Sequence, residues 1–168
     1  YFTLYASLYW SELARFLINS YIALSPFWFS EGAYKAFTLS STTAGGSHKK
    51  YAASEFLDLS SVLYLGVDVV DSVIDSNINL YSASNIDFIS RDITTYELPQ
   101  VDLIICKDVL QHLCNKDVIS VLVKIIKSSK FALITNDFYP ESTSNRDIEN
   151  GDYRYLDLTL SPFFLDVI

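Results

Sequence analysis

Two short stretches, YLGVD (64–68) and VDLIICKDVLQH (101–112), decide the fold of this 168-residue chain. Each begins as a run of mostly apolar residues and reaches a charged residue, Asp68 in the first and Lys107-Asp108 in the second. A continuous apolar run is typical of a strand in a parallel sheet, because helices cover both faces of such a sheet. The carboxyl ends of parallel strands meet at one edge, so these charged side chains should emerge together there.

The residues between 60 and 136 alternate between strand-like and helix-like patterns. Strands are predicted at 61–69, 85–90, 101–106 and 130–135. Asp71 can cap the first helix, whose apolar face is formed by Ile74, Ile78 and Tyr81. Asn115 is predicted to cap the second helix, which carries a core-facing stripe of Val118, Val121, Leu122, Ile125 and Ile126.

A polar loop follows Asp137, and YRYLDL (153–158) is predicted to add one more strand. The alternation of strands and helices indicates an α/β fold with a doubly wound, mostly parallel sheet. We therefore expect a helical, aromatic N-terminal cap at 1–40 and a doubly wound α/β domain at 41–168, either complete or incomplete.

Composition narrows the range of functions. Half of the residues are hydrophobic, so a core can form without metals or disulfides. The net charge of −8 argues against a nucleic-acid partner, because affinity for nucleic acid comes mainly from Lys and Arg. The two cysteines, Cys106 and Cys114, cannot form a disulfide scaffold, and we expect a reducing, cytoplasmic compartment.

The N-terminal segment 1–29 is rich in aromatic residues. No membrane span is expected there, because polar residues and a proline interrupt every window of about 20 residues, and two packed helices are favoured instead. No secretory signal is evident. The chain starts at Tyr1, contains no Met and ends in the apolar run FFLDVI, which indicates a fragment or an incomplete gene model.

Ligands of open α/β sheets bind outside the carboxyl ends of the strands, so the residues that end each strand are the candidate site. They are Asp68, Asp92, Lys107, Asp108, Asn136 and Asp137. A carboxylate at the end of a strand, such as Asp68 after 61–67, can accept hydrogen bonds from both hydroxyls of a ribose. The alternative for Asp68 is a helix cap, but Asp71 is placed to fill that position.

Four blocks then resemble consecutive motifs of the class I S-adenosylmethionine-dependent methyltransferases. They are YLGVDVVDSVIDSN, NIDFISRDIT, LPQVDLIICKDVLQHL and NRDIENGDYRYLDLTLSPF, and they cover about 62–164 in order. The resemblance is strongest to a small bacterial-type group that carries a D-V-L-x-H-L block. It implies S-adenosylmethionine as cofactor and a small molecule or a protein side chain as methyl acceptor.

The resemblance also implies roles for individual residues. Asp68 would bind the ribose hydroxyls, and Asp92 would accept a hydrogen bond from the adenine amino group while Ile93 packs on the ring. Cys106, Lys107 and Asp108 would line the region of the methyl donor. The late loop, with Arg146, Asp147, Asp152 and Arg154, would lie over the acceptor pocket or simply be solvated.

His112 is the candidate general base, because its ordinary pKa lies near the working pH. It stands four residues after Asp108, which would place both side chains on one helix face towards the same cavity. Asp108 is the second candidate for proton transfer. An equally good interpretation of His112 is an imidazole held by a backbone carbonyl. His48, in a Gly-Ser loop, is expected to be solvated.

The family binds its cofactor through an acidic residue and a glycine-rich turn after the first strand. Here the only glycine pair is Gly45-Gly46, with no acidic residue just before it. In one alternative, 37–43 is a degenerate first strand, Gly45-Gly46 its cofactor-binding loop and 49–57 its helix. In the other, which we favour, that strand and its turn are absent and cofactor binding is badly weakened.

Methyl transfer is therefore the leading hypothesis, and a non-catalytic binding domain of the same fold is the second. A nicotinamide-dependent oxidoreductase ranks third, because no G-x-G-x-x-G follows a strand. No metal site is expected from the spacing of the His and Cys residues, and no G-x-S-x-G elbow of a hydrolase is present.

Overall fold

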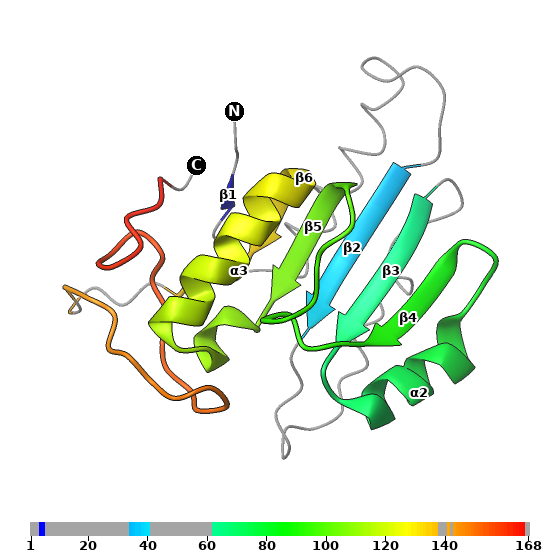
Figure 1. Ribbon diagram of the computed structural model, residues 1–168, viewed down its shortest axis with the longest axis horizontal. Coiled ribbons are helices and arrows are strands. Elements are labelled where there is room, and N and C mark those ends of the chain that lie inside the picture. The colour runs from blue at the N-terminus through cyan, green and yellow to red at the C-terminus, as the bar shows by residue number, and fades with distance from the viewer. Residues whose placement is uncertain (1–3, 6–33, 41–61, 138–140, 142, 167–168) are drawn as a thin grey trace.

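The computed structural model describes residues 4–5, 34–40, 62–137, 141 and 143–166 (Figure 1). Within these residues six strands form one sheet in the order β1-β6-β5-β2-β3-β4, and every pair of neighbours is parallel. The strands are β1 (Leu4–Tyr5), β2 (Tyr34–Ser40), β3 (Val62–Asp68), β4 (Ile86–Ser90), β5 (Val101–Lys107) and β6 (Ser129–Ile134). The predicted parallel sheet is thus present.

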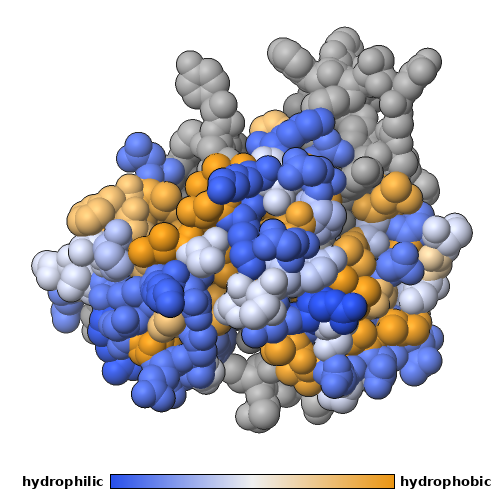
Figure 2. Space-filling model, in the orientation of Figure 1, coloured by the Kyte–Doolittle hydropathy of each residue, from blue (hydrophilic) through white to orange (hydrophobic). Residues whose placement is uncertain are grey.

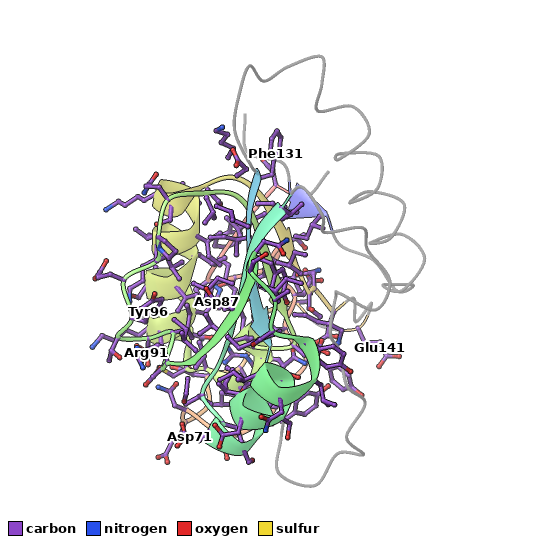
Figure 3. All side chains as sticks on the ribbon, turned by 90° about the vertical axis from the view of Figure 1, so that its right-hand side faces the viewer. Asp71, Asp87, Arg91, Tyr96, Phe131 and Glu141 are labelled. Atoms are coloured by element: carbon purple, nitrogen blue, oxygen red, sulfur yellow. The ribbon has the colours of Figure 1, made fainter. Side chains whose placement is uncertain are left out.

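Helices cover opposite faces of this sheet. Helix α2 (Asp71–Tyr81) connects β3 to β4, and α3 (Asn115–Ser128) connects β5 to β6, after the short 3-10 helix η3 (Leu110–His112). Figure 3 shows the sheet nearly edge-on between the two helices, with Tyr96 on the side of α3. Crossovers on both faces make the sheet doubly wound, as the alternation of patterns predicts.

Strand β2 overturns the favoured prediction that a central strand is missing. It pairs in parallel with β3 on one side and with β5 on the other, so it occupies the middle of the sheet. The alternative predicted a first strand at 37–43. A strand is present there, but it spans Tyr34–Ser40. The same strand, with β1, falls inside the predicted helical cap at 1–40, so these two stretches are strands and not helix.

The hydrophobic core has two parts. Under α3, one cluster includes Ile104, Val118, Val121, Ile125 and Ile134, each completely or almost completely buried. Under α2, a smaller cluster joins Tyr64, Ile74 and Phe88, and the Tyr64 and Phe88 rings meet edge to face with centroids 5.9 Å apart. The apolar patterns of both helices therefore face the sheet as predicted, with exceptions at their rims.

Those exceptions are Ile78 and Ile126, which were predicted to face the core. They are 43% and 47% exposed. Ile126 follows the buried Ile125 and is turned away from it by the helical step of about 100° per residue, which places Ile126 at the rim of the buried face. Leu80 of α2 is also exposed, and Figure 2 shows hydrophobic patches interrupting the surface over α2, at lower right.

Both helix caps were predicted wrongly. The N-caps are Val70 and Cys114, and neither makes a side-chain capping bond. Asp71 and Asn115 are instead the first residues of α2 and α3. A capping residue must lie just before the helix, with its side chain turned back to the first free amides. A shift of one position along the chain therefore prevents Asp71 and Asn115 from capping.

The predicted strand at 153–158 does not form. This stretch is extended but belongs to no ladder, because its backbone bonds to loop groups and side chains and not to a neighbouring strand. None of the helices in the described residues is long and apolar enough to cross a membrane.

Candidate functional site

The strand order reverses between β2 and β5, which makes their carboxyl ends the expected ligand site of such a sheet. Lys107 ends β5, and its ammonium pairs with the carboxylate of the next residue, Asp108. Asp108 has a φ of 55°, a left-handed conformation that is uncommon for residues other than glycine. Its amide donates to Thr135 Oγ1 at 3.0 Å, which joins the ends of β5 and β6.

Cys106 does not line this edge with its side chain, contrary to the prediction. Its thiol is completely buried in the core beneath α3. Burial, together with the nearby charge of Asp108, raises the pKa of Cys106 to about 12. Its carbonyl accepts a hydrogen bond from the amide of Thr135 at 3.0 Å. Cys106 is therefore a packing residue, and Lys107 and Asp108 are the polar groups at the end of β5.

Asp68 and Asp92 lie on neighbouring strand ends. Strands β3 and β4 pair directly, and the amide of Arg91 donates to the Asp68 carbonyl at 2.9 Å. The Asp68 side chain accepts a bond from the amide of Val70 at 2.9 Å, and the residue is only 2% exposed. Asp68 therefore braces the turn into α2, and a ribose can reach its carboxylate only if the site opens.

Asp92 is exposed and is better placed to meet a ligand. Its Oδ1 accepts from both the amide and the hydroxyl of Thr94, each at 2.8 Å. Its Oδ2 accepts no hydrogen bond from the residues that the structure describes. The side chain of Ile93 is buried in the core cluster beneath α3, so most of its surface is already used in packing.

Asn136 and Asp137, which follow β6, hold the extended stretch 154–158. Asn136 Oδ1 accepts from the amide of Leu158 at 2.6 Å. Asp137 Oδ2 accepts from the amide of Leu156 at 3.0 Å, and the Asp137 amide donates to the Leu156 carbonyl at 2.8 Å. These two strand-end residues therefore anchor the residues that follow, which we call the late segment (143–160).

Asn145 fixes the other side of the late segment. Its Nδ2 lies 2.8 Å from the carbonyl of Asp157 and 2.9 Å from that of Ser161, and its Oδ1 accepts from the amide of Asp157. The buried carboxylate of Asp157 accepts from the amide and hydroxyl of Thr159. Polar groups that a loop would leave exposed are thus satisfied inside the protein.

Arg154 joins the late segment to η3. Its side chain is 1% exposed, and its guanidinium donates to the carbonyls of Arg146 and Leu113, each at 2.8 Å. The backbone amides of Arg154 and Gly151 donate to the carbonyls of Gln111 and His112. Burial lowers the pKa of Arg154, while Asp147, 3.8 Å away, opposes the shift. In the described part of the chain its Nε has no partner.

The late segment also supplies the missing cap of α3. Asp147 Oδ1 accepts from the amide of Asn115 at 2.7 Å, and Asn150 Oδ1 accepts from the amide of Cys114 at 2.7 Å. The bond to Asn115 lowers the pKa of Asp147. Figure 1 shows this segment, orange to red, running past the start of α3. A predicted acceptor-loop residue, Asp147, thus has a structural role in this conformation.

His112 lies on η3 and contacts the late segment through its ring. Its Nδ1 is 2.9 Å from the carbonyl oxygen of Asp152. Since a carbonyl can only accept, Nδ1 carries the proton and Nε2 is the nitrogen that can accept one. The carbonyl-held imidazole was one of the two interpretations of His112, and this geometry still leaves a base at Nε2.

The helical argument that placed His112 beside Asp108 is wrong, because Asp108 is left-handed and η3 begins only at Leu110. The aromatic ring beside His112 is that of Tyr153. Its ring centroid is 5.6 Å from that of His112. Burial raises the pKa of Tyr153, and so do the charges of Asp137, Tyr155 and Asp108 around it.

The residues that sequence reasoning missed are Thr135, Asn145, Asn150, Tyr153 and Tyr155. Alternation in YRYLDL was a usable signal, since Tyr153 and Tyr155 are exposed while Arg154 and Leu156 are buried. Arg146 donates to the carbonyl of Tyr153 and is exposed, as the solvated-loop interpretation expects. Gly45, Gly46 and His48 lie outside the described residues.

Comparison with solved structures places this architecture among known folds, whereas no family model and no curated protein matches the sequence. An S-adenosylmethionine-dependent methyltransferase from Clostridium acetobutylicum matches with a TM-score of 0.57 and 14% identity over 84% of this chain and 57% of that one. The plantazolicin methyltransferase BpumL, solved with SAH, matches with a TM-score of 0.52 and 14% identity over 74% and 48%.

The mitomycin 7-O-methyltransferase MmcR matches with a TM-score of 0.51 and 18% identity over 66% of this chain and 33% of that one. This chain therefore spans between a third and about three fifths of the length of these three proteins. At such identities the likeness concerns the fold. The described sheet and its helices share the Rossmann-like α/β fold of these three solved methyltransferases.

Proposed function

We propose that this protein binds S-adenosylmethionine at the carboxyl edge of its sheet and transfers the methyl group to a small-molecule or protein acceptor. The observation that carries the proposal is the central position of β2 between β3 and β5. It creates the reversal of strand order at which such sheets bind ligands, with Asp68 and Asp92 on the adjacent strand ends.

The residues present suit the adenosyl part of this cofactor. Asp92 offers an exposed carboxylate oxygen, Oδ2, for the adenine amino group, and Asp68 would take the ribose hydroxyls once its site opens. Lys107 and Asp108 would face the amino-acid part, and the assignment of Gly45 and Gly46 to it rests on the sequence alone, because both lie outside the described residues. When bound, the cofactor supplies an electrophilic methyl group on a sulfonium.

The chain's own contribution would be to orient the acceptor and to remove its proton. His112 Nε2 is the candidate base, because Nδ1 is committed to the Asp152 carbonyl. Asp108 is the second candidate, although its carboxylate pairs with Lys107. Holding the reacting groups in line supplies much of the rate in this kind of reaction.

A second function, binding of a partner or an adenosyl ligand without turnover, is favoured by one observation. The carboxylate that should take the ribose is almost completely buried and already bonded to Val70. A domain that had lost cofactor turnover could keep Asp68 for this structural purpose alone.

Calorimetric titration with S-adenosylhomocysteine tests cofactor binding, which methyl transfer requires and binding of a partner without cofactor does not. The unaltered chain should release heat at one site, and Asp92→Ala should weaken binding on the order of tenfold, as expected for a lost bond to a charged acceptor. Asp71→Ala removes the same charge from the nearby first turn of α2 and should leave the affinity unchanged. Absence of heat with the unaltered chain would reject methyl transfer in favour of the second function.

A further inference from the structure

The exposed rings beside the candidate base form a short row at the sheet edge. His112 and Tyr153 have centroids 5.6 Å apart, and Tyr153 and Tyr155 have centroids 5.8 Å apart with their planes at 69°. Tyr153 is 49% exposed and Tyr155 is 63% exposed. We call His112, Tyr153 and Tyr155 the ring row.

The backbone that carries the tyrosines of the ring row is held by buried, hydrogen-bonded neighbours. The residues between and after the tyrosines, Arg154 and Leu156, are buried and bonded to η3 and to Asp137. Burial of a guanidinium is costly unless its bonds are nearly complete, so this stretch of backbone has few alternative conformations. The backbone that carries the two exposed rings is therefore held in place, which favours binding because less freedom remains to be lost.

The charge around the ring row selects among planar ligands. The Asp137 carboxylate lies beside the ring row, because its Oδ2 accepts a hydrogen bond at 3.0 Å from the amide of Leu156, the residue that follows Tyr155. Burial is the main cause of the raised pKa of Tyr153, and the charge of Asp137 adds to it. Three cations lie nearby, but Lys107 is paired with Asp108 and Arg146 is bonded to the Tyr153 carbonyl on the backbone side. The third, Arg154, is buried, and its guanidinium is bonded to two backbone carbonyls. Aromatic faces and carboxylates together attract a cation.

We propose that the ring row binds the methyl acceptor, and that this acceptor is a protonated amine attached to a flat aromatic ring system. The inference rests on the proposed methyl transfer for its chemical outcome, whereas the binding claim stands on the ring row itself. The ammonium would lie near Asp137 and the flat ring against Tyr155.

Atoms and charges balance in the proposed transfer of the methyl group to the amine. The ammonium first loses a proton to His112 Nε2, which frees the nitrogen lone pair. That pair forms the new bond to the methyl carbon while the bond between carbon and sulfur breaks, and its electrons remain on sulfur as a thioether. The positive charge passes from the sulfonium to the methylated amine, and no oxidant or reductant is needed.

Three probes that share the indole ring and differ in charge test the proposal: tryptamine as cation, tryptophol as neutral molecule and indole-3-propionate as anion. Titration calorimetry without cofactor should show tryptamine binding on the order of tenfold more tightly than tryptophol, with the anion weakest. Tyr155→Ala should weaken tryptamine binding by a similar factor, whereas Tyr155→Phe, which keeps the ring, should retain most of it.

Phe164→Ala provides the matched control, because Phe164 is 71% exposed and lies outside the ring row. It should leave tryptamine binding unchanged. Equal affinity for the three probes, failure of all of them to bind at millimolar concentration, or an unchanged affinity in Tyr155→Ala would overturn the proposal. A parallel titration with S-adenosylhomocysteine separates the two ideas, since amine binding without cofactor binding would reject methyl transfer and keep the ring row as an amine site.

Discussion

The two halves of the carboxyl edge are built differently. At β3 and β4 the carboxylates make short-range bonds, since Asp68 and Asp92 each accept from an amide two residues further along the chain. At β5 and β6 they are long-range, since Arg154 reaches Leu113 and His112 reaches Asp152, about forty residues apart in sequence. The β3–β4 half is stabilised mainly by apolar packing under α2. The β5–β6 half is stabilised by a network of buried polar groups.

This difference has an energetic consequence. A network of buried polar groups is stable only when nearly all of its members are satisfied, so loss of one member should disturb many others. Local turns supported by an apolar cluster should respond to changes of volume instead. Substitutions in each half can therefore test whether the two halves differ in this way.

Arg154→Met should have the largest effect. The variant keeps most of the buried volume but leaves the carbonyls of Leu113 and Arg146 without their donors, and it should lower the free energy of unfolding by about 3 kcal/mol. Urea unfolding followed by circular dichroism measures the change. Arg146→Met, which removes an exposed guanidinium, is the control and should change stability by less than about 0.5 kcal/mol. Equal effects of the two substitutions would contradict a special role for the buried arginine.

Gly66→Ala tests the apolar half. A Cβ at this position would meet ring atoms of Phe88 at 2.5 and 2.8 Å, so the buried ring must shift. We expect a loss of about 2 kcal/mol, in the range for overpacked cores. Phe88→Leu combined with Gly66→Ala should recover part of this loss, which a double-mutant cycle of urea midpoints would show. Strictly additive effects would mean that the two side chains do not compete for space.

Asp147→Asn should have the smallest effect, and one that depends on pH. The pKa of Asp147 is lowered from 3.8 in the folded protein, chiefly by the bond from the Asn115 amide. Its charged form therefore stabilises the fold above pH 3.8, and this contribution is lost as the pH falls through the folded pKa. The difference in urea midpoint between the unaltered chain and the variant should shrink on acidification. A difference independent of pH would remove Asp147 from the cap of α3.

The same contrast explains what could be predicted from the sequence. Continuous apolar runs that end at Asp68 and Lys107 identified β3 and β5, because burial on both faces leaves a strong local pattern. Strand β2 falls inside the predicted helical cap at 1–40, and only the alternative of a degenerate first strand at 37–43 covered part of it. The local signal there was weak, and only the pairing partners on both sides define the strand.

The late segment could not be predicted for the same reason. YRYLDL alternates like a strand, and its inward and outward residues do alternate through Leu156. Its backbone bonds, however, go to Asn136, Asp137 and Asn145 and not to a ladder. Side chains distant in sequence therefore decide the conformation of this stretch. The start of α3 is likewise capped by distant residues, since Asp147 and Asn150 accept from its first amides in place of the predicted cap, Asn115.

The central claim is that the β3–β4 half of the edge holds the adenosyl cofactor while the late segment serves the acceptor. Amide proton and nitrogen spectra of the ¹⁵N-labelled chain, recorded during titration with S-adenosylhomocysteine, test it most directly. The account predicts the largest shifts at Val70 and Thr94, whose amides bond to Asp68 and Asp92, and small shifts at Arg154 and Tyr155. Shifts confined to the late segment, or no shifts at saturating ligand, would contradict it.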